Sequence, residues 1–493
     1  MSTKLSSQGL PVKVGSVTLM TPGLEGQATS HAPGSHGMRS AEAATNEFNA
    51  AQANTNLQVQ ETIEITNARE VPAPTAFTRS TTFGEPAVQV EVPDPGKKWG
   101  QVVLHTDQGG VMTWHLAVDN NNKVVSTRGR GTRTYLIRRQ VVPSLDVGQT
   151  RGITTAIGKK IIKVLVFPLL DPLIGEVSSF FASRWETKRR PYRMRQFSPD
   201  DYQSASPPLV DDAGWERLGQ GRALLIVHGT FSQTHSGFAG FSPQVVQDLN
   251  QIYGGRVFAF DHPTISEDPT ENAKKFVEML PQESKLDIDI ICHSRGGLVS
   301  RALAEKQGEL SVGARTLTVR RIVFVATPNA GTVLTDSKYL GSLVDRYTNL
   351  LNFFPDTGLI DVLDAIITVV KQLAVAAYGG LDGLQSMLPG GAYLADLNSG
   401  GGAVSTDYYA MASNYEPQPG ALREFLRDQL ADKIFKAEND LIVPTSGVFA
   451  ANGDGKFPIS NHFVFSAQEY VQHGGFFANQ KACQKMQEWL SAQ

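Results

Sequence analysis

The second half of the chain alternates between short apolar runs and segments whose apolar residues have helical spacing. Apolar runs predict strands at 223–227, 256–260, 286–291, 321–326 and 407–412, and helical segments such as 272–279 lie between them. Strands that alternate with helices are typical of a mostly parallel sheet covered by helices on both faces. From about residue 220 to 493 the sequence therefore predicts an α/β domain.

The segment 56–150 has a different pattern. Its apolar and polar residues alternate over short runs, at 57–65, 87–92, 101–104, 111–118 and 135–142. Turn residues at 107–110 and 119–122 separate some of these runs. Period-2 runs divided by turn clusters are typical of a small antiparallel β domain. None of its residues has the spacing of a catalytic site, so we expect a role in packing or recognition.

Two further segments flank the β domain. Residues 1–55 are rich in Ser, Thr, Gly, Asn, Gln and Ala, which predicts a flexible N-terminal segment. Residues 151–219 form an apolar and then basic connection, in which the apolar stretch 161–181 precedes the cationic side chains of 184–195. We expect an interdomain helix with solvated charges. The alternative is a peripheral membrane contact through 158–197.

A long insertion interrupts the α/β pattern at about 332–403. It contains the stretch 359–377, which is apolar except for one narrow polar stripe made of Asp361, Asp364, Thr368 and Lys371. Such spacing predicts a helix with a single polar edge. We expect this helix to be buried or to cover something apolar.

The sharpest chemical signal is the segment 292–297, Cys-His-Ser-Arg-Gly-Gly, between a predicted strand and a predicted helix. A serine at such a junction sits on a tight turn that presents its hydroxyl above the sheet, and small neighbours let strand and helix approach. The usual pattern is Gly-x-Ser-x-Gly, and here Cys292 replaces the first glycine. We predict that Ser294 is a nucleophile; the alternative is a structural serine at a helix N-cap.

A second signal, His228-Gly229-Thr230, follows the predicted strand 223–227. Acyl transfer needs backbone N–H groups aimed at the developing oxyanion. A glycine-containing turn can supply one donor, and the residue after the nucleophile can supply another. We assign these donors to the N–H groups of Thr230 and Arg295. The alternative is an ordinary turn at a strand end.

A serine nucleophile needs a base. In this kind of fold the base follows the nucleophile along the chain, and two histidines follow Ser294, namely His462 and His473. His473 lies in a glycine-flanked loop before the last helical segment, where an imidazole can reach the nucleophile. His462 begins an apolar, strand-like run. We therefore predict His473 as the base.

The base in turn needs an acid that orients it. Asp440 follows 433–436, which we expect to be a strand, and lies on a loop just before a proline. Glu438 is an alternative two residues away, and Asp432 is less suitable because it precedes that strand. We predict Asp440 as the acid.

Together these residues resemble the α/β-hydrolase family, in its lipase and esterase branch. The resemblance covers about residues 220–493 and includes the stretches 225–230, 293–299 and 325–332. It implies an α/β-hydrolase fold with a mostly parallel sheet, a helical lid at the insertion and a small N-terminal antiparallel β domain. Asp440 and His473 match the acid and base of the family by position.

The resemblance also implies a reaction: hydrolysis of carboxylic esters, of lipid or other acyl substrates, by a Ser-His-Asp triad through an acyl-enzyme. A small-ester substrate is the alternative to a lipid. An acyltransferase or thioesterase would use the same triad, and a non-catalytic scaffold that binds lipid or protein is a further alternative. The scheme needs no metal and no cofactor. Protein partners are left unknown.

Composition narrows these classes. The 493 residues carry 45 Lys and Arg against 48 Asp and Glu, a balance that argues against a nucleic-acid partner. Only two cysteines are present, which is too few for a disulfide-rich scaffold or a multi-cysteine zinc site. We find neither a secretory signal nor an apolar run of about 18 residues. The default expectation is a cytoplasmic protein, and export without a signal stays open.

Overall fold

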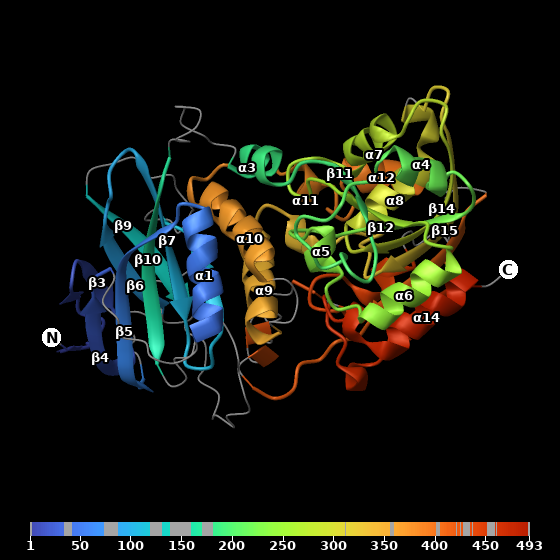
Figure 1. The fold of residues 1–493 in the computed structure, drawn as a ribbon. Helices are drawn as coiled ribbons and strands as arrows, with labels where there is room; N and C mark the ends of the chain where they lie inside the picture. Colours follow the sequence, from blue (N-terminus) through green and yellow to red (C-terminus); the bar gives the residue numbers. More distant parts are fainter. Residues whose placement is uncertain are drawn as a thin grey trace.

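Three helices lie between two layered parts of the molecule (Figure 1). They are α1 (Glu42–Asn54), α9 (Leu340–Phe353) and α10 (Leu359–Ala374). The N-terminal strands form one part, and a second sheet with its helices forms the other. The computed structural model describes residues 2–33, 42–72, 87–118, 131–138, 159–169, 181–310, 312–354, 359–400, 405–420, 422–423, 425–426, 434–435, 437–450, 459 and 461–491.

The C-terminal part is built on a seven-stranded sheet of order β11-β13-β12-β14-β15-β16-β17. All neighbours pair in parallel except β11 with β13, which is antiparallel. The strands are β11 (Arg193–Gln196), β12 (Ala223–Val227), β13 (Val257–Asp261), β14 (Lys285–His293), β15 (Thr316–Val325), β16 (Asp407–Ser413) and β17 (Asn461–Phe465). The five strands expected from apolar runs thus appear as β12 to β16.

Helices cover both faces of this sheet, as its apolar strands require. Alternate residues of β12 enter two separate cores: Leu225 packs on the side of α7 (Pro269–Met279) and α8 (Gly296–Glu305), and Leu224 on the side of α6 (Pro243–Ile252) and α14 (Gln480–Ser491). The shorter helices are α3 (Phe181–Arg189), α4 (Asp212–Leu218), α5 (Thr234–Gly237), α11 (Asp382–Gln385), α12 (Ala392–Ser399), η1 (Gln307–Glu309), η2 (Val333–Thr335), η3 (Thr445–Val448), η4 (Ala467–Glu469) and η5 (Phe476–Ala478).

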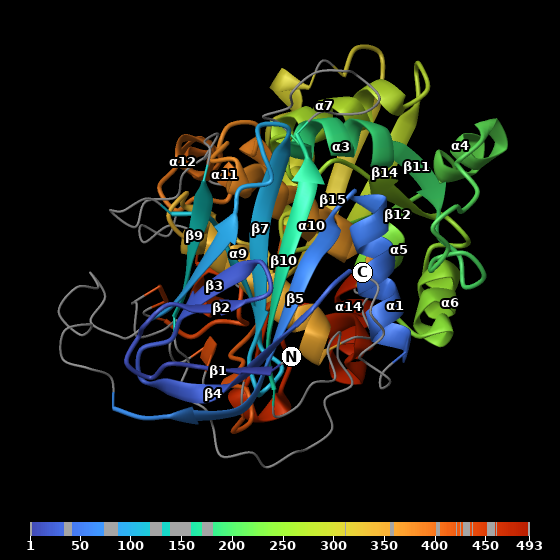
Figure 2. The same cartoon turned by 90° about the vertical axis from the view of Figure 1, so that its left-hand side faces the viewer.

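The N-terminal part, which we call the β unit, consists of two antiparallel sheets and the helix α1 (Figure 2). One sheet has the order β1-β4-β5-β10-β7-β8 and the other β2-β3-β6-β9, and they share one apolar core. The strands are β1 (Ser2–Lys4), β2 (Val12–Val14), β3 (Val17–Met20), β4 (Leu24–His31), β5 (Gln58–Glu70), β6 (Ala87–Pro93), β7 (Trp99–Thr106), β8 (Met112–His115), β9 (Thr132–Arg138) and β10 (Lys160–Pro168).

The first 55 residues differ from the flexible segment that we expected. Residues 2–33 contain β1 to β4, and 42–54 form α1. Val17 and Leu19 are fully buried because β3 pairs with β6, some 70 positions further along the chain. Local composition could not reveal this partner, since the strands are short and rich in Ser, Thr and Gly. Residues 34–41 lie outside the described part of the chain.

The connecting segment also differs from the expected interdomain helix with solvated charges. Its apolar start forms the strand β10, which lies between β5 and β7. Lys188 and Arg189 are exposed, whereas Arg190 and Arg195 are buried. Arg195 donates hydrogen bonds to the carbonyl oxygens of a nearby loop at 3.1 to 3.3 Å, which compensates its loss of water. Most of the expected apolar stretch after β10, at 170–180, lies outside the described residues.

The insertion at 332–403 contains η2 and the helices α9 to α12. The apolar helix expected at 359–377 is α10, whose residues from 362 to 374 are buried throughout. Helices α9 and α10 pack on each other, and α10 also contacts α1, α3 and β7. Within the described ranges, no helix combines the length and apolar character that crossing a bilayer requires.

Candidate active site

Ser294 occupies the tight turn between β14 and α8. Its φ of +51° lies in the left-handed region, where a residue with a side chain is strained. The Ser294 N–H donates to the carbonyl of Val325 at 2.9 Å, which fixes the turn to the neighbouring strand. A side chain at Gly296 would overlap the backbone carbonyl of His228, so only glycine lets α8 approach β12 this closely. A strained serine at this position of a mostly parallel sheet is an α/β-hydrolase-like arrangement.

The structure brings Ser294, His473 and Asp440 together. The Ser294 Oγ lies 3.1 Å from Nε2 of His473, and the Nδ1 of His473 lies 2.8 Å from Oδ2 of Asp440. All three residues are 1% exposed. The other carboxylate oxygen of Asp440 accepts the N–H groups of Ile442 and Val443 at 3.0 and 2.8 Å. These bonds hold the carboxylate in place and leave Oδ2 to the imidazole.

The alternative acid and base candidates lie elsewhere. Glu438 and His462 are both exposed. The ring of His462 stacks on that of Phe449 with centroids 4.1 Å apart, and Glu438 accepts a hydrogen bond from Asn414. It is His473 that meets the serine. Asp432 lies outside the described residues. At its two described positions, the segment 433–436 does not form the strand that we expected.

The two residues assigned as oxyanion donors flank the serine. The backbone at Gly229, directly before Thr230, lies very close to Ser294. A Cβ on residue 229 would be 2.7 Å from the Cβ of Ser294. Arg295 is the N-cap residue directly before α8, and its side chain is buried. The Nε of Arg295 donates to the carbonyl of Gly383 in the insertion at 2.8 Å. Burial lowers the pKa of this guanidinium, with nearby carboxylates opposing the shift.

Sequence reasoning missed Tyr347, which lies on α9 in the insertion. Its hydroxyl interacts with the side chains of Ser294 and Thr230, and its ring packs edge-on against Phe231 with centroids 4.8 Å apart. Burial raises the pKa of Tyr347, so the phenol keeps its proton. No motif surrounds Tyr347, and only the folded insertion brings it to the serine.

A second missed residue is His293, directly before the nucleophile. Its Nε2–H donates to the backbone carbonyl of His473 at 2.9 Å. Burial, followed by the charge of His473, lowers the pKa of His293 to about 3, so the ring stays neutral near pH 7. His293 therefore helps to hold the loop that carries the candidate base.

Helix α3 braces the turn that carries Thr230. The buried carboxylate of Glu186 accepts the three successive N–H groups of 264–266, at 2.6, 3.0 and 2.8 Å. The Oγ1 of Thr264 in turn accepts the N–H of Phe231 at 3.2 Å. A buried carboxylate is stable only with such donors, and here the donors link α3 to the residue after Thr230.

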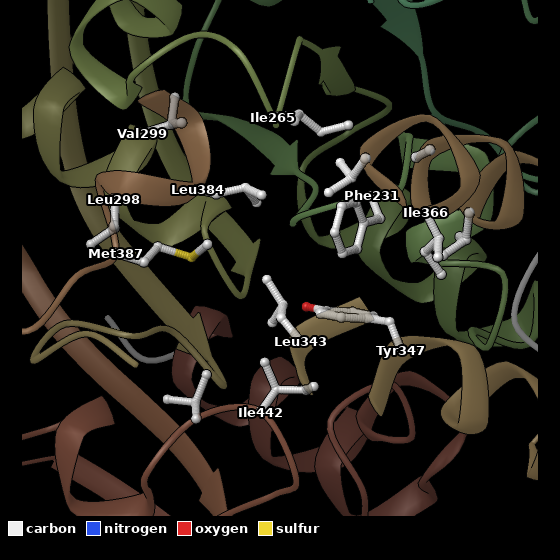
Figure 3. Close-up of a cluster of buried hydrophobic side chains, with 14 of the residues drawn as sticks. Phe231, Ile265, Leu298, Val299, Leu343, Tyr347, Ile366, Leu384, Met387 and Ile442 are labelled. Atoms are coloured by element: carbon white, nitrogen blue, oxygen red, sulfur yellow. The ribbon is translucent and has the colours of Figure 1, made fainter. Parts of the chain in front are cut away.

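Buried apolar side chains from several elements meet in one cluster (Figure 3). Leu343 and Tyr347 come from α9, Met387 from the end of the insertion, and Phe231 and Ile442 from loops of the C-terminal part. All five are buried. Three of them adjoin the candidate site: Tyr347 interacts with Ser294, the Sδ of Met387 lies 3.8 Å from Oγ1 of Thr230, and the N–H of Ile442 donates to Asp440.

The histidines at the end of β12 and β13 form a structural pair. His228 and His262 stack with centroids 4.2 Å apart, and the Nε2 of His228 accepts the N–H of His262 at 3.1 Å. Burial lowers the pKa of His228 to about 4, so it is neutral near pH 7. Over the described part of the chain, no group of three or more His, Cys, Asp or Glu side chains is arranged to hold a metal ion.

Known structures with a similar fold include several hydrolases. A mature lipase of Bacillus licheniformis is 15% identical, with a TM-score of 0.35, and the match covers 55% of this chain and 92% of that one. Lipase 1 of Pelosinus fermentans is 14% identical, with a TM-score of 0.37 and coverages of 55% and 99%. Lipase B of Aspergillus fumigatus is 12% identical, with a TM-score of 0.30 and coverages of 56% and 54%.

At these identities and TM-scores the likeness does not identify a substrate. No curated protein matches the sequence significantly. A family model does match, over residues 189–491, which is more than half of the chain and includes the elbow serine and the candidate acid and base. The chain therefore belongs to the family described as domain of unknown function DUF7379.

Proposed function

We propose that the chain is a serine hydrolase that cleaves carboxylic ester bonds in lipid or other acyl substrates. The observation that carries this proposal is the buried row from Ser294 through His473 to Asp440, with hydrogen-bond distances of 3.1 and 2.8 Å. A serine that only caps a helix needs neither a buried histidine nor a carboxylate behind it. The row therefore favours catalysis over a capping role or a non-catalytic scaffold.

In the proposed reaction, the Oγ of Ser294 attacks the ester carbonyl while Nε2 of His473 takes its proton. Asp440 holds the Nδ1–H and stabilises the imidazolium that forms. The backbone N–H groups of Thr230 and Arg295 stabilise the oxyanion. His473 then gives its proton to the leaving alcohol oxygen, which leaves an acyl-enzyme. Water, deprotonated by His473, attacks the acyl-enzyme and releases the carboxylic acid and the free serine.

The apolar surroundings support an acyl chain as part of the substrate. Met387 and Ile442 adjoin Thr230 and Asp440, and both belong with Leu343 to the buried apolar cluster of Figure 3. Each buried methylene of a ligand gains roughly 0.8 kcal/mol in such surroundings. A hydrolase of small polar esters would have no use for this lining, so we favour esters with an apolar acyl chain.

We further propose that α9 and α10 form a lid. Ser294 and His473 are each 1% exposed, so a substrate reaches them only after something moves. Helix α9 carries Tyr347, which interacts with Ser294 and Thr230 and lies edge-on to His473, so α9 helps to cover the site. Lid opening would then precede acylation, as in other enzymes that close over their substrates.

Hydrolysis of p-nitrophenyl esters of graded acyl length tests the proposal. We expect turnover that rises from acetyl to medium chains, because the longer chains bury more apolar surface. Ser294→Ala is expected to abolish it. A flat or falling chain-length profile would contradict the acyl-chain preference, and turnover that survives in Ser294→Ala would contradict the nucleophile.

A further inference from the structure

Helix α9 touches the catalytic site and the β unit at the same time. On one side the hydroxyl of Tyr347 interacts with Ser294 and Thr230, and its ring lies edge-on to that of His473 with centroids 6.1 Å apart. On the other side, polar residues at helical spacing bond to β8 and to the turn before it: Asp345, Thr348 and Asn349 bond to β8, and Asn352 bonds to Gly110. A shift of α9 relative to β8 that moves Tyr347 away from the serine must therefore break bonds between α9 and β8.

The contact with β8 uses the free edge of a sheet. β8 is the last strand of the six-stranded sheet, and among the described strands none pairs with its outer side. The amide of Asn349 takes that place: its Oδ1 accepts the N–H of Met112 at 2.9 Å, and its Nδ2 donates to the carbonyl of Met112 at 2.7 Å. Asn352 donates to the carbonyl of Gly110 at 2.6 Å. A side-chain amide that imitates a strand satisfies backbone groups that would be costly to bury unpaired.

Trp114 of β8 makes two further bonds to the same helix. Its backbone N–H donates to Oδ1 of Asp345 at 2.8 Å, and its indole Nε1–H donates to Oγ1 of Thr348 at 2.9 Å. The three helix residues Thr348, Asn349 and Asn352 are at most 3% exposed. Buried and mutually satisfied polar groups fix one register, because a shift leaves several of them unpaired.

The β unit holds α10 as well. The Nζ of Lys371 donates to the carbonyl of Thr55 at 2.7 Å, and Nδ2 of Asn54 donates to Oδ2 of Asp364 at 3.1 Å. The polar edge that the sequence predicted on this helix thus meets the end of α1. The helices α9 and α10 are therefore both in contact with the β unit (Figure 1).

We propose that the β unit is an intramolecular inhibitor of the hydrolase: it holds α9 over Ser294 through the edge of β8. This inference rests on the proposed serine hydrolase function. In the held state the Tyr347 hydroxyl lies beside Ser294 and Thr230, where the substrate carbonyl would have to enter. Separation of α9 from β8 withdraws Tyr347 and admits substrate.

The alternative is an insertion that opens by itself, with the β unit as a passive neighbour. The bonding pattern speaks against it, because α9 is tied to β8 by its backbone-directed side chains and α10 is tied to α1. A lid with one side facing solvent could open without breaking any bond to another domain. Here, movement of α9 and α10 relative to the β unit breaks the bonds to β8 and α1.

The test compares the rate at which a fluorophosphonate labels the serine in the full-length wild-type chain and in variants of the contact. Asn349→Ala removes two bonds to Met112, and we expect labelling about three to ten times faster, as one or two lost hydrogen bonds would favour opening. Trp114→Phe removes only the indole bond to Thr348 and keeps most of the packing, and we expect a smaller rise. Thermal unfolding shows that each variant is folded.

Asn250→Ala is the matched control. Asn250 is also a helical asparagine, and its amide donates to the carbonyls of Phe197 and Val246 at 3.1 and 2.9 Å, far from α9 along the chain. Its labelling rate should stay within about twofold of wild type. If the wild type is labelled but the labelling rate does not rise in Asn349→Ala and Trp114→Phe, the inhibitory role of the β unit is wrong. The serine hydrolase proposal is then unaffected. Folded proteins that are never labelled would overturn the hydrolase itself.

Discussion

At the scale of single residues, the candidate site depends on a histidine that is held from both sides. The Nδ1 of His473 meets Asp440, its Nε2 meets Ser294, and its carbonyl accepts a bond from His293. The other histidine after the nucleophile, His462, packs on the aromatic ring of Phe449 instead.

The two histidines give a first prediction. His473→Ala should lower kcat for ester hydrolysis by at least about 10³-fold, since it removes the base that activates the serine. His462→Ala is the control and should leave kcat within about threefold of wild type, because the ring lies outside the site. Steady-state kinetics with a p-nitrophenyl ester measure both. Equal losses in the two variants would argue against His473 as the base.

Asp345 gives a second residue-scale prediction, on pH. Burial raises the pKa of this carboxyl to about 8 in the folded protein, against about 3.9 in the unfolded chain. Between these values the folded state binds more protons at Asp345, so the contribution of this group to stability is fully present below pH 4 and is lost as pH rises toward 8. This component of the pH dependence should vanish in Asp345→Asn, whose side chain does not ionise.

The unfolding temperatures of wild type and Asp345→Asn measure that component. Their difference should change between pH 5 and pH 8, with the wild type losing stability relative to the variant as pH rises. A difference that stays constant over this range would mean that Asp345 ionises normally in the folded protein.

At the scale of elements, the strands of the C-terminal sheet could be predicted from the sequence, whereas most of the β unit could not. The strands β12 to β16 are apolar over their whole length because helices cover both faces, and that pattern is visible locally. The elbow and the candidate base and acid follow these strands along the chain, so the sequence could select the three side chains that the structure brings together. The assignment of Thr230 and Arg295 as oxyanion donors stays a prediction.

The elements that the sequence missed depend on distant partners. The strand β10 lacks the alternation that marks a strand because both of its faces are buried: Leu165 and Phe167 belong to one core, and Ile162 and Val164 to another. The first four strands are too short and polar to be recognised alone. The role of Tyr347 depends on the packing of α9 against the site, which no local pattern encodes.

Helix α3 gives an element-scale prediction. Glu186→Gln replaces a carboxylate that accepts three backbone N–H groups by an amide that offers a single acceptor oxygen. We expect a loss of about 1–3 kcal/mol in stability, because a buried N–H is left unpaired. Because the braced loop supports Phe231, kcat should also fall. Chemical denaturation and ester kinetics measure the two effects.

Glu271→Gln is the control for that variant. Glu271 pairs with Lys274 on the surface of α7, where both side chains are more than a third exposed. Such a pair contributes little, so stability should change by less than about 0.5 kcal/mol. Equal changes in Glu186→Gln and Glu271→Gln would show that α3 does not brace the site.

At the scale of the whole molecule, the insertion joins two parts that the sequence suggested as independent units. The β unit, the helices α9 and α10 and the catalytic sheet pack in series (Figure 1). Ser294 lies at the end of this series and is buried. The helix α9, which carries Tyr347 to it, is bonded to the β unit. This arrangement favours the proposal of a hydrolase whose site is closed by α9 over that of an esterase with an open site.

The most direct test of the central claim is to map the covalent adduct of a fluorophosphonate on the full-length protein by mass spectrometry. The account predicts one adduct, on Ser294, which is absent from Ser294→Ala and strongly reduced in His473→Ala. An adduct on another serine, or none on a folded protein even when Asn349→Ala and Trp114→Phe loosen the lid, would contradict it.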